Sequence, residues 1–232
     1  VIKNSGYKRY SLRANISRKV TDWLEVGTNQ SFTSSTTDFA NTLSFNTGVV
    51  RSALLFPPTY GPNMDTTTAD ELNWLAANPG AYVRSAIDQL NGSNYFSSSF
   101  VQIKFLKNFT FRQNIGLGYN VQDRKSYYGR ETQEGKTPIN GKASVGHNTW
   151  KSLTAESILT YDNTFAKIHH VNVMGAFTLE SSNWANDQQV ATNFPDDLTG
   201  ANDMSRALDK ATLSGDKGQQ RLASFLGRVN YN

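Results

Sequence analysis

Strict alternation of apolar and polar residues is the feature that most constrains how this chain can fold. Between residues 10 and 17, polar side chains such as Arg13 and Asn15 separate four apolar ones: Tyr10, Leu12, Ala14 and Ile16. Successive side chains of a strand point to opposite faces, so the pattern predicts a strand with one apolar and one wet face. A wet face that carries arginine favours a wall between lipid and a water-filled lumen over half of a dry sandwich.

The same pattern predicts about seven strands along the chain. We expect them at about Tyr7–Ser17, Trp23–Ser34, Asn94–Phe105, from Phe109 to just before Arg124, Asn148–Tyr161, Lys167–Ser181 and from Gln219 onward. The links alternate between short ones (18–22, 106–108, 162–166) and long ones (35–93, 124–146, 182–218). Aromatic residues flank the short links. Short periplasmic turns, long outward loops and an aromatic girdle are typical of bacterial outer-membrane barrels.

The long first connection carries signals for two short helical turns. One is expected over Thr47–Leu55 and ends before Pro57, because proline disfavours the helical state in the residue before it. The other is expected to begin near Thr68, which can cap it, and to end at Asn78–Gly80. Both would lie in an extracellular loop.

Composition excludes several classes of protein. Hydrophobic residues make up 38% of the chain, mean hydropathy is −0.52, and no stretch approaches the roughly 20 apolar residues of a membrane-spanning helix. The chain has no cysteine, so disulfides and thiolate metal sites are excluded. Its net charge of +4 comes from scattered basic residues, which argues against nucleic-acid binding.

Catalytic and cofactor signals are weak, and we expect no enzyme activity, no cofactor and no metal site. His169 and His170 are adjacent in a predicted strand and so point to opposite faces. The run Gly116-Leu117-Gly118 lacks the third glycine and the strand-to-helix setting of a phosphate loop, and its glycines are expected to relieve crowding on the wet face.

Binding is the plausible role for polar side chains in such a wall. Candidate ligand-binding residues on the wet face are Arg13, Asn29, Arg112 and Asn114. The alternative, which the architecture of such a wall favours, is that they simply line a wet cavity and pair with a plug. In the first long loop, Tyr60 and Trp74 could stack on a sugar ring, pack under a partner, or form a small loop core.

Several segments, in order, resemble the barrel region of SusC/RagA-type TonB-dependent transporters. They are Ser5–Asn15, Trp23–Asn29, Ala53–Gly61, Leu159–Phe165, His170–Gly175 and Ser224–Tyr231. The resemblance implies an all-β fold: about seven strands of a roughly 22-stranded antiparallel barrel in the outer membrane of Bacteroidota. Residues 1–232 would then be one partial barrel domain, an internal piece of a longer chain whose plug and remaining strands lie elsewhere.

The resemblance also implies a function. Such a transporter imports a nutrient, an oligosaccharide or a peptide, that a SusD-like surface lipoprotein captures as a lid, and the TonB complex acts on the plug to open a path. Two other readings of the residues stay open. One is a passive porin or another outer-membrane barrel, and the other is a soluble, glycan-binding β-sandwich whose apolar faces pack together.

Overall fold

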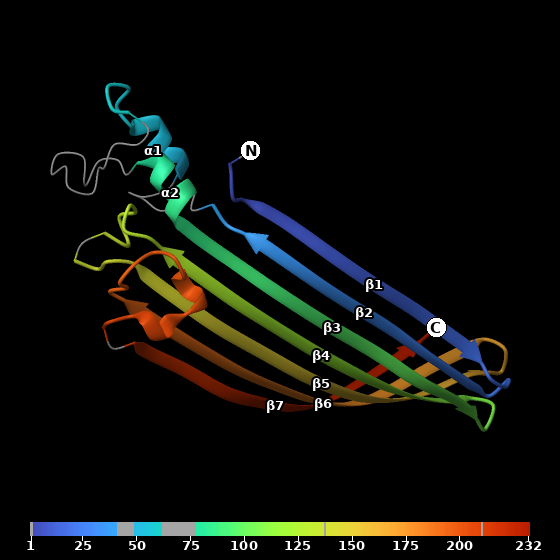
Figure 1. Cartoon of the computed structure of the whole chain (residues 1–232). Helices are drawn as coiled ribbons and strands as arrows, with labels where there is room; N and C mark the ends of the chain where they lie inside the picture. The colour runs from blue at the N-terminus through green and yellow to red at the C-terminus, as the bar shows by residue number, and fades with distance from the viewer. Residues whose placement is uncertain (1, 41–48, 62–77, 137, 210) are drawn as a thin grey trace.

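The chain forms a seven-stranded antiparallel sheet in which the strands lie side by side in chain order (Figure 1). The computed structural model describes residues 2–40, 49–61, 78–136, 138–209 and 211–232. The strands are β1 (Gly6–Lys19), β2 (Leu24–Asp38), β3 (Ala86–Phe105), β4 (Phe109–Tyr128), β5 (Lys142–Phe165), β6 (His169–Thr192) and β7 (Thr212–Tyr231). Within the described ranges, each strand pairs only with its neighbours in the chain. This arrangement confirms the predicted all-β section of a large antiparallel barrel.

Short turns lie at one end of the sheet and long connections at the other, as the sequence predicts (Figure 1). Two of the short turns place consecutive non-glycine residues at positive φ. These are Leu106 (47°) and Lys107 (59°), and Ala166 (51°) and Lys167 (63°). Two consecutive left-handed residues give the local twist that lets neighbouring strands join without splaying.

The predicted strand ends are wrong on the side of the long connections. β3 begins at Ala86 rather than near Asn94, β7 begins at Thr212 rather than near Gln219, and β5 and β6 contain 24 residues each. The long connections are correspondingly shorter than predicted. In these extensions polar residues are common on both faces, so strict alternation is lost, yet the backbone ladder between neighbouring strands continues.

Two short helices lie in the first long connection, α1 (Val49–Leu55) and α2 (Pro79–Ser85). α1 matches the described part of the first predicted turn. A helix that the sequence does not predict begins at the run Asn78–Gly80: the Asn78 side chain accepts a hydrogen bond from the Gly80 backbone N–H at 2.9 Å and caps the start of α2. The predicted start at Thr68 lies outside the described residues. Two 3₁₀ turns, η1 (Gly200–Asn202) and η2 (Met204–Arg206), follow β6.

No helix in the described ranges has both the length and the apolar character needed to cross a membrane.

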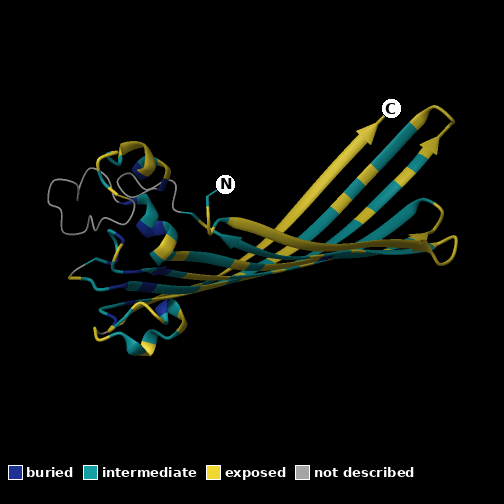
Figure 2. Cartoon of the chain, turned by 45° about the horizontal axis from the view of Figure 1, so that its top comes forward, coloured by how far each residue is buried: buried dark blue, intermediate teal, exposed yellow. Residues whose placement is uncertain are grey.

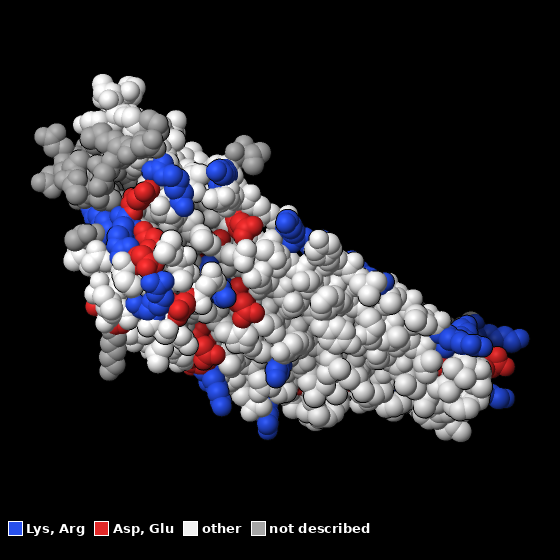
Figure 3. Space-filling view, in the orientation of Figure 1, with Lys and Arg blue, Asp and Glu red and all other residues white. Residues whose placement is uncertain are grey.

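The strand register assigns every residue of the sheet to one of two faces. We call the face that carries Leu12 and Leu117 the outer face, and the face that carries Arg13 and Asn114 the inner face. Large apolar side chains of the outer face include Val101, Phe111, Ile115, Leu153, Leu159, Phe177, Phe225 and Val229. From Leu153 to Phe165 the outer face of β5 carries no charged residue. Figure 3 shows charged side chains gathered at the two ends of the sheet, with a charge-free area between them.

Aromatic side chains form a ladder beside the short turns. The Phe105 and Phe109 ring centroids are 5.6 Å apart, and Phe109 and Tyr161 are 4.9 Å apart. All three lie on the outer face. This is where a membrane-interface girdle of the predicted kind would lie.

Buried residues are concentrated at the end of the sheet with the long connections (Figure 2). One cluster, on the outer face, consists of Tyr127, Ala143, Ala191 and Phe194. The other joins Val49 of α1 and Tyr82 of α2 to partly buried residues that include Ala86 and Tyr128 of the inner face. Along the rest of the sheet many large apolar residues are exposed, for example Leu12 at 71%. An exposed, mainly apolar surface of this kind suits contact with lipid.

Candidate functional site

The inner face brings together the four strand residues that sequence analysis singles out for binding. Arg13 and Asn29 lie on β1 and β2, and Arg112 and Asn114 lie on β4, all on the inner face. They form two groups, because β3 lies between β2 and β4. That the four share one face follows from the register; contact with a ligand stays a prediction.

Arg112 is held in place by several neighbours on the inner face. Its Nε donates to Asn114 Oδ1 at 2.9 Å and its Nη1 donates to Gln102 Oε1 at 3.2 Å. Asn114 Nδ2 in turn donates to Glu156 Oε2 at 2.7 Å. The guanidinium carbon lies 3.8 Å from the centroid of the Phe100 ring, a cation–π contact. With two of its N–H groups engaged, Arg112 is positioned mainly as part of the wall, with its remaining donors available to a solute.

A glycine makes room for the aromatic part of this cluster. A Cβ atom on Gly27 would lie 2.3 Å from a ring carbon of Phe100. Gly27 and Phe100 are direct partners across β2 and β3, so the ring lies over the glycine. Any side chain at position 27 would push Phe100 and, through it, Arg112.

The two candidate loop residues do not join this cluster. Tyr60 follows α1, and its ring centroid lies 6.2 Å from that of Phe56 in a tilted arrangement, which favours a small loop core. Trp74 lies outside the described residues.

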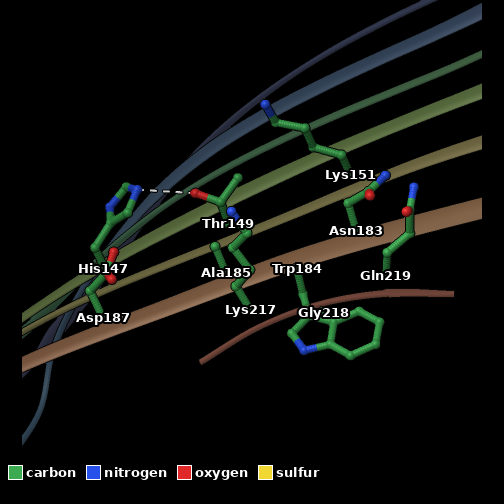
Figure 4. Close-up of a pocket in the computed structure, with 10 residues that line it drawn as sticks. All are labelled: His147, Thr149, Lys151, Asn183, Trp184, Ala185, Asp187, Lys217, Gly218 and Gln219. Atoms are coloured by element: carbon green, nitrogen blue, oxygen red, sulfur yellow. Dashed lines mark hydrogen bonds between the residues drawn. The ribbon is translucent and has the colours of Figure 1, made fainter. Parts of the chain in front are cut away.

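An open cavity of about 680 Å³ lies over β5, β6 and β7 beyond the charge-free area (Figure 4). Most of its lining side chains belong to the outer face: His147, Thr149, Lys151, Asn183, Ala185, Asp187, Lys217 and Gln219. His147 is fixed by Asp123 Oδ1, 2.5 Å from Nδ1, and by Thr149 Oγ1, 3.0 Å from Nε2. Since the cavity opens on the outer face, it is not part of the inner wall.

The connection after β6 is bound to the outer face by carboxylates. Asp197 Oδ1 accepts hydrogen bonds from Tyr127 Oη at 2.7 Å and Arg130 Nη1 at 3.0 Å. Burial, with the nearby Asp197 carboxylate, raises the pKa of Tyr127 far above its ordinary value, so the phenol donates this bond at all physiological pH values. Two neighbours lower the pKa of the Asp196 carboxylate. The larger contribution is the hydrogen bond from the Leu198 backbone N–H, and the smaller is the ion pair in which Arg206 Nη2 lies 2.5 Å from Asp196 Oδ2.

Sequence analysis missed two inner-face residues, Trp150 and Trp184. Trp184 falls in a segment predicted to be a loop (182–218), whereas the structure places it within β6, directly opposite Trp150 on β5. One signal was available in the sequence: the two tryptophans lie at equal distances from the short turn between β5 and β6. This signal can be used only when β6 is known to continue past residue 181.

Comparisons with known proteins agree with this fold. No family model matches the chain. It is 23% identical over 239 residues to TonB-dependent receptor P3 of Formosa agariphila, and 22% identical over 241 residues to TonB-dependent receptor P26 of the same organism. All of this chain is covered, but only 24% and 23% of those receptors.

Solved structures give the same result. The RagAB peptide importer in its open-open state matches with a TM-score of 0.77 and 16% identity, over 98% of this chain and 26% of that chain. A structure of the RagAB peptide transporter matches with a TM-score of 0.79 and 17% identity, over the same shares. The chain thus spans about a quarter of the length of the proteins it matches. Its fold matches a section of the RagAB structures.

Proposed function

We propose that this chain forms part of the barrel wall of a TonB-dependent importer that carries a nutrient across the outer membrane. The observation that carries the proposal is the two-faced, seven-stranded sheet, whose counterpart over 98% of its length is the RagAB peptide importer. The cargo would be an oligosaccharide or a peptide. As in any transporter, no bond of the cargo is broken, and the chain would have no catalytic role.

Each face of the sheet has a distinct role in this proposal. The outer face contacts lipid through its charge-free area, where a charged side chain would be costly. The inner face borders the water-filled path, and polar groups such as Arg112 and Asn114 present hydrogen-bonding atoms to it. Resistance to unfolding comes from the backbone hydrogen bonds between strands, because lipid offers no partner to an unpaired N–H or C=O group.

The end with the long connections would meet the partner that delivers the cargo. There the strands extend well beyond the roughly 9–11 residues needed to span a bilayer, since β5 and β6 each contain 24 residues. The two buried clusters hold α1, α2 and the connection after β6 against these extensions. A rigid rim of this kind supports the proposal of a SusD-like surface lipoprotein seated on the barrel as a lid. The TonB complex would act on a plug domain elsewhere in the full-length protein.

Purification and import together test the proposal. The full-length protein would be isolated from outer membranes in mild detergent, and its mass and bound partners determined. We expect a barrel-sized chain together with a surface lipoprotein, and uptake of its nutrient that stops when TonB is deleted. Uptake that continues without TonB would instead support a passive porin. A water-soluble protein with no membrane fraction would support the glycan-binding β-sandwich.

A further inference from the structure

Two tryptophans lie side by side on the inner face. Trp150 of β5 and Trp184 of β6 are direct partners in the strand register. Figure 4 shows the Trp184 indole on the opposite side of the sheet from Lys151, Asn183 and Gln219, which belong to the outer face. The pair therefore faces the path along which cargo would move.

Each indole lies close to a glycine of the neighbouring strand. A Cβ atom on Gly218 would lie within 2.1–2.8 Å of three ring carbons of Trp184, and one on Gly118 would lie 3.3 Å from Trp150 Cζ3. Without a side chain at these positions, the rings can lie down against the sheet and turn a flat side toward the path. Trp150 is 42% exposed, although it is one of the largest side chains of the sheet.

Neutral hydrogen-bonding side chains surround the pair. On the inner face of β3–β7, the row of the two tryptophans and the rows directly above and below it include Asn94, Asn120, Gln122, Asn148, Ser152, Ser182, Asn186 and Gln220. Asp216 is the one charged residue in these rows, and it accepts a hydrogen bond from Trp184 Nε1 at 3.4 Å. Amide side chains both donate and accept hydrogen bonds, as sugar hydroxyl groups do.

The pair also lies where cargo would enter. Lys151, next to Trp150 in the chain, is the charged residue that ends the charge-free part of the outer face of β5. Trp150 and Trp184 are therefore level with the border of the lipid-facing area, on the side of the long connections.

We propose that Trp150 and Trp184 form a two-part platform, with one indole toward β4 and the other over β7, on which rings of an uncharged oligosaccharide stack while the surrounding amides bond its hydroxyl groups. This inference rests on the proposed import function and chooses its cargo class. A flat aromatic surface fits the C–H face of a pyranose ring, and a few polar groups around an aromatic surface fix the orientation of a ligand. A charged peptide finds few opposite charges in these rows.

Binding by the full-length protein in its native complex tests the platform. The probes are a panel of neutral oligosaccharides, namely gluco-, xylo-, manno-, galacto- and fructo-oligosaccharides of four to seven units, and a mixture of peptides of similar size. Binding is measured by calorimetry. We expect at least one oligosaccharide to bind the parent protein, and Trp150→Ala and Trp184→Ala each to weaken its binding about tenfold. Trp23→Ala, a tryptophan substitution at a short turn, is the matched control and should leave binding unchanged.

A further variant tests the platform without removing an aromatic side chain. Gly218→Val keeps both indoles but moves the Trp184 ring, and it should also weaken binding; heat-modifiable migration in gels verifies that each variant folds. Failure of every oligosaccharide to bind, or equal binding by the parent and both alanine variants, overturns the platform. If uptake of a peptide still requires TonB in that case, the import function stands and only the cargo assignment fails.

Discussion

The half of the sheet near the short turns and the half near the long connections differ in how their side chains are arranged. Near the short turns, the outer face is mainly apolar, with polar exceptions such as Gln30, Ser97 and Gln113, and the inner face is mainly polar. Near the long connections polar residues are common on both faces, and order comes from hydrogen bonds and two small buried apolar clusters. Alternation of apolar and polar side chains therefore marks the first half only, while the backbone ladder is common to both. The comparison predicts that equivalent substitutions will have different effects in the two halves and on the two faces.

The largest expected effect is from a charge on the outer face of the lipid-facing half. Leu117→Arg should lower the free energy of unfolding from vesicles by about 2–4 kcal/mol. Ser98→Arg, one register row away on the inner face beside Gly116, is the matched control and should cost much less. The measurement is urea-induced unfolding of the full-length protein in phospholipid vesicles. Equal costs at the two positions would contradict the assignment of the faces.

A smaller effect is expected where an aromatic ring covers a glycine. Gly27→Val should cost about 1–3 kcal/mol, because its side chain would enter the space that Phe100 fills. Gly175→Val, where nothing lies within 4 Å of the added Cβ, is the control and should be nearly neutral. The same unfolding experiment compares the two variants. A neutral Gly27→Val would show that Phe100 and Arg112 can shift freely.

In the half with the long connections, the loss of one carboxylate should act locally. Asp197→Asn removes the charge that binds Tyr127 and Arg130, at a cost of about 1–3 kcal/mol to the docking of residues 193–209. Hydrogen exchange should rise in this segment and not in β1 or β2. Asp203→Asn is the control, because the hydrogen bonds of Asp203 to Ser205 are local. Unchanged exchange in Asp197→Asn would show that the apolar cluster alone holds the connection.

The smallest effect concerns pH. The pKa of Asp196 is lowered in the folded protein, first by the Leu198 N–H and then by Arg206, so its contribution is fully present above its ordinary pKa of about 3.9. That contribution is lost as pH falls through the lowered value. Exchange protection near residue 196, corrected for the intrinsic rate, should be flat between pH 7 and 5 and fall below about pH 4. Arg206→Gln should weaken this dependence; an identical profile would exclude the ion pair as its cause.

The sequence predicted the lipid-facing half well and the other half poorly, for one physical reason. Alternation reports a boundary between lipid and water, so Leu12 and Arg13 reveal their faces without a structure. The extensions of β5 and β6 carry polar residues on both faces, such as Asn183 and Asn186, and asparagine is uncommon in strands. The ladder that holds these extensions pairs residues many positions apart in the sequence, for example Lys142 with Thr192. Trp184 was missed for this reason. Trp74 and the start of the second predicted helical turn lie outside the described residues and stay predictions.

The neighbour-only pairing of the strands has a consequence for how such a wall is made. Among the seven described strands, none needs a distant partner within this chain, so each hairpin can be added to the one before it while the polypeptide is still being delivered to the membrane. At every stage the newest strand offers an open edge as a template for the next. The order of synthesis and the order of assembly therefore coincide, and the wall can lengthen over evolution by the gain of whole hairpins without rearrangement of those already present.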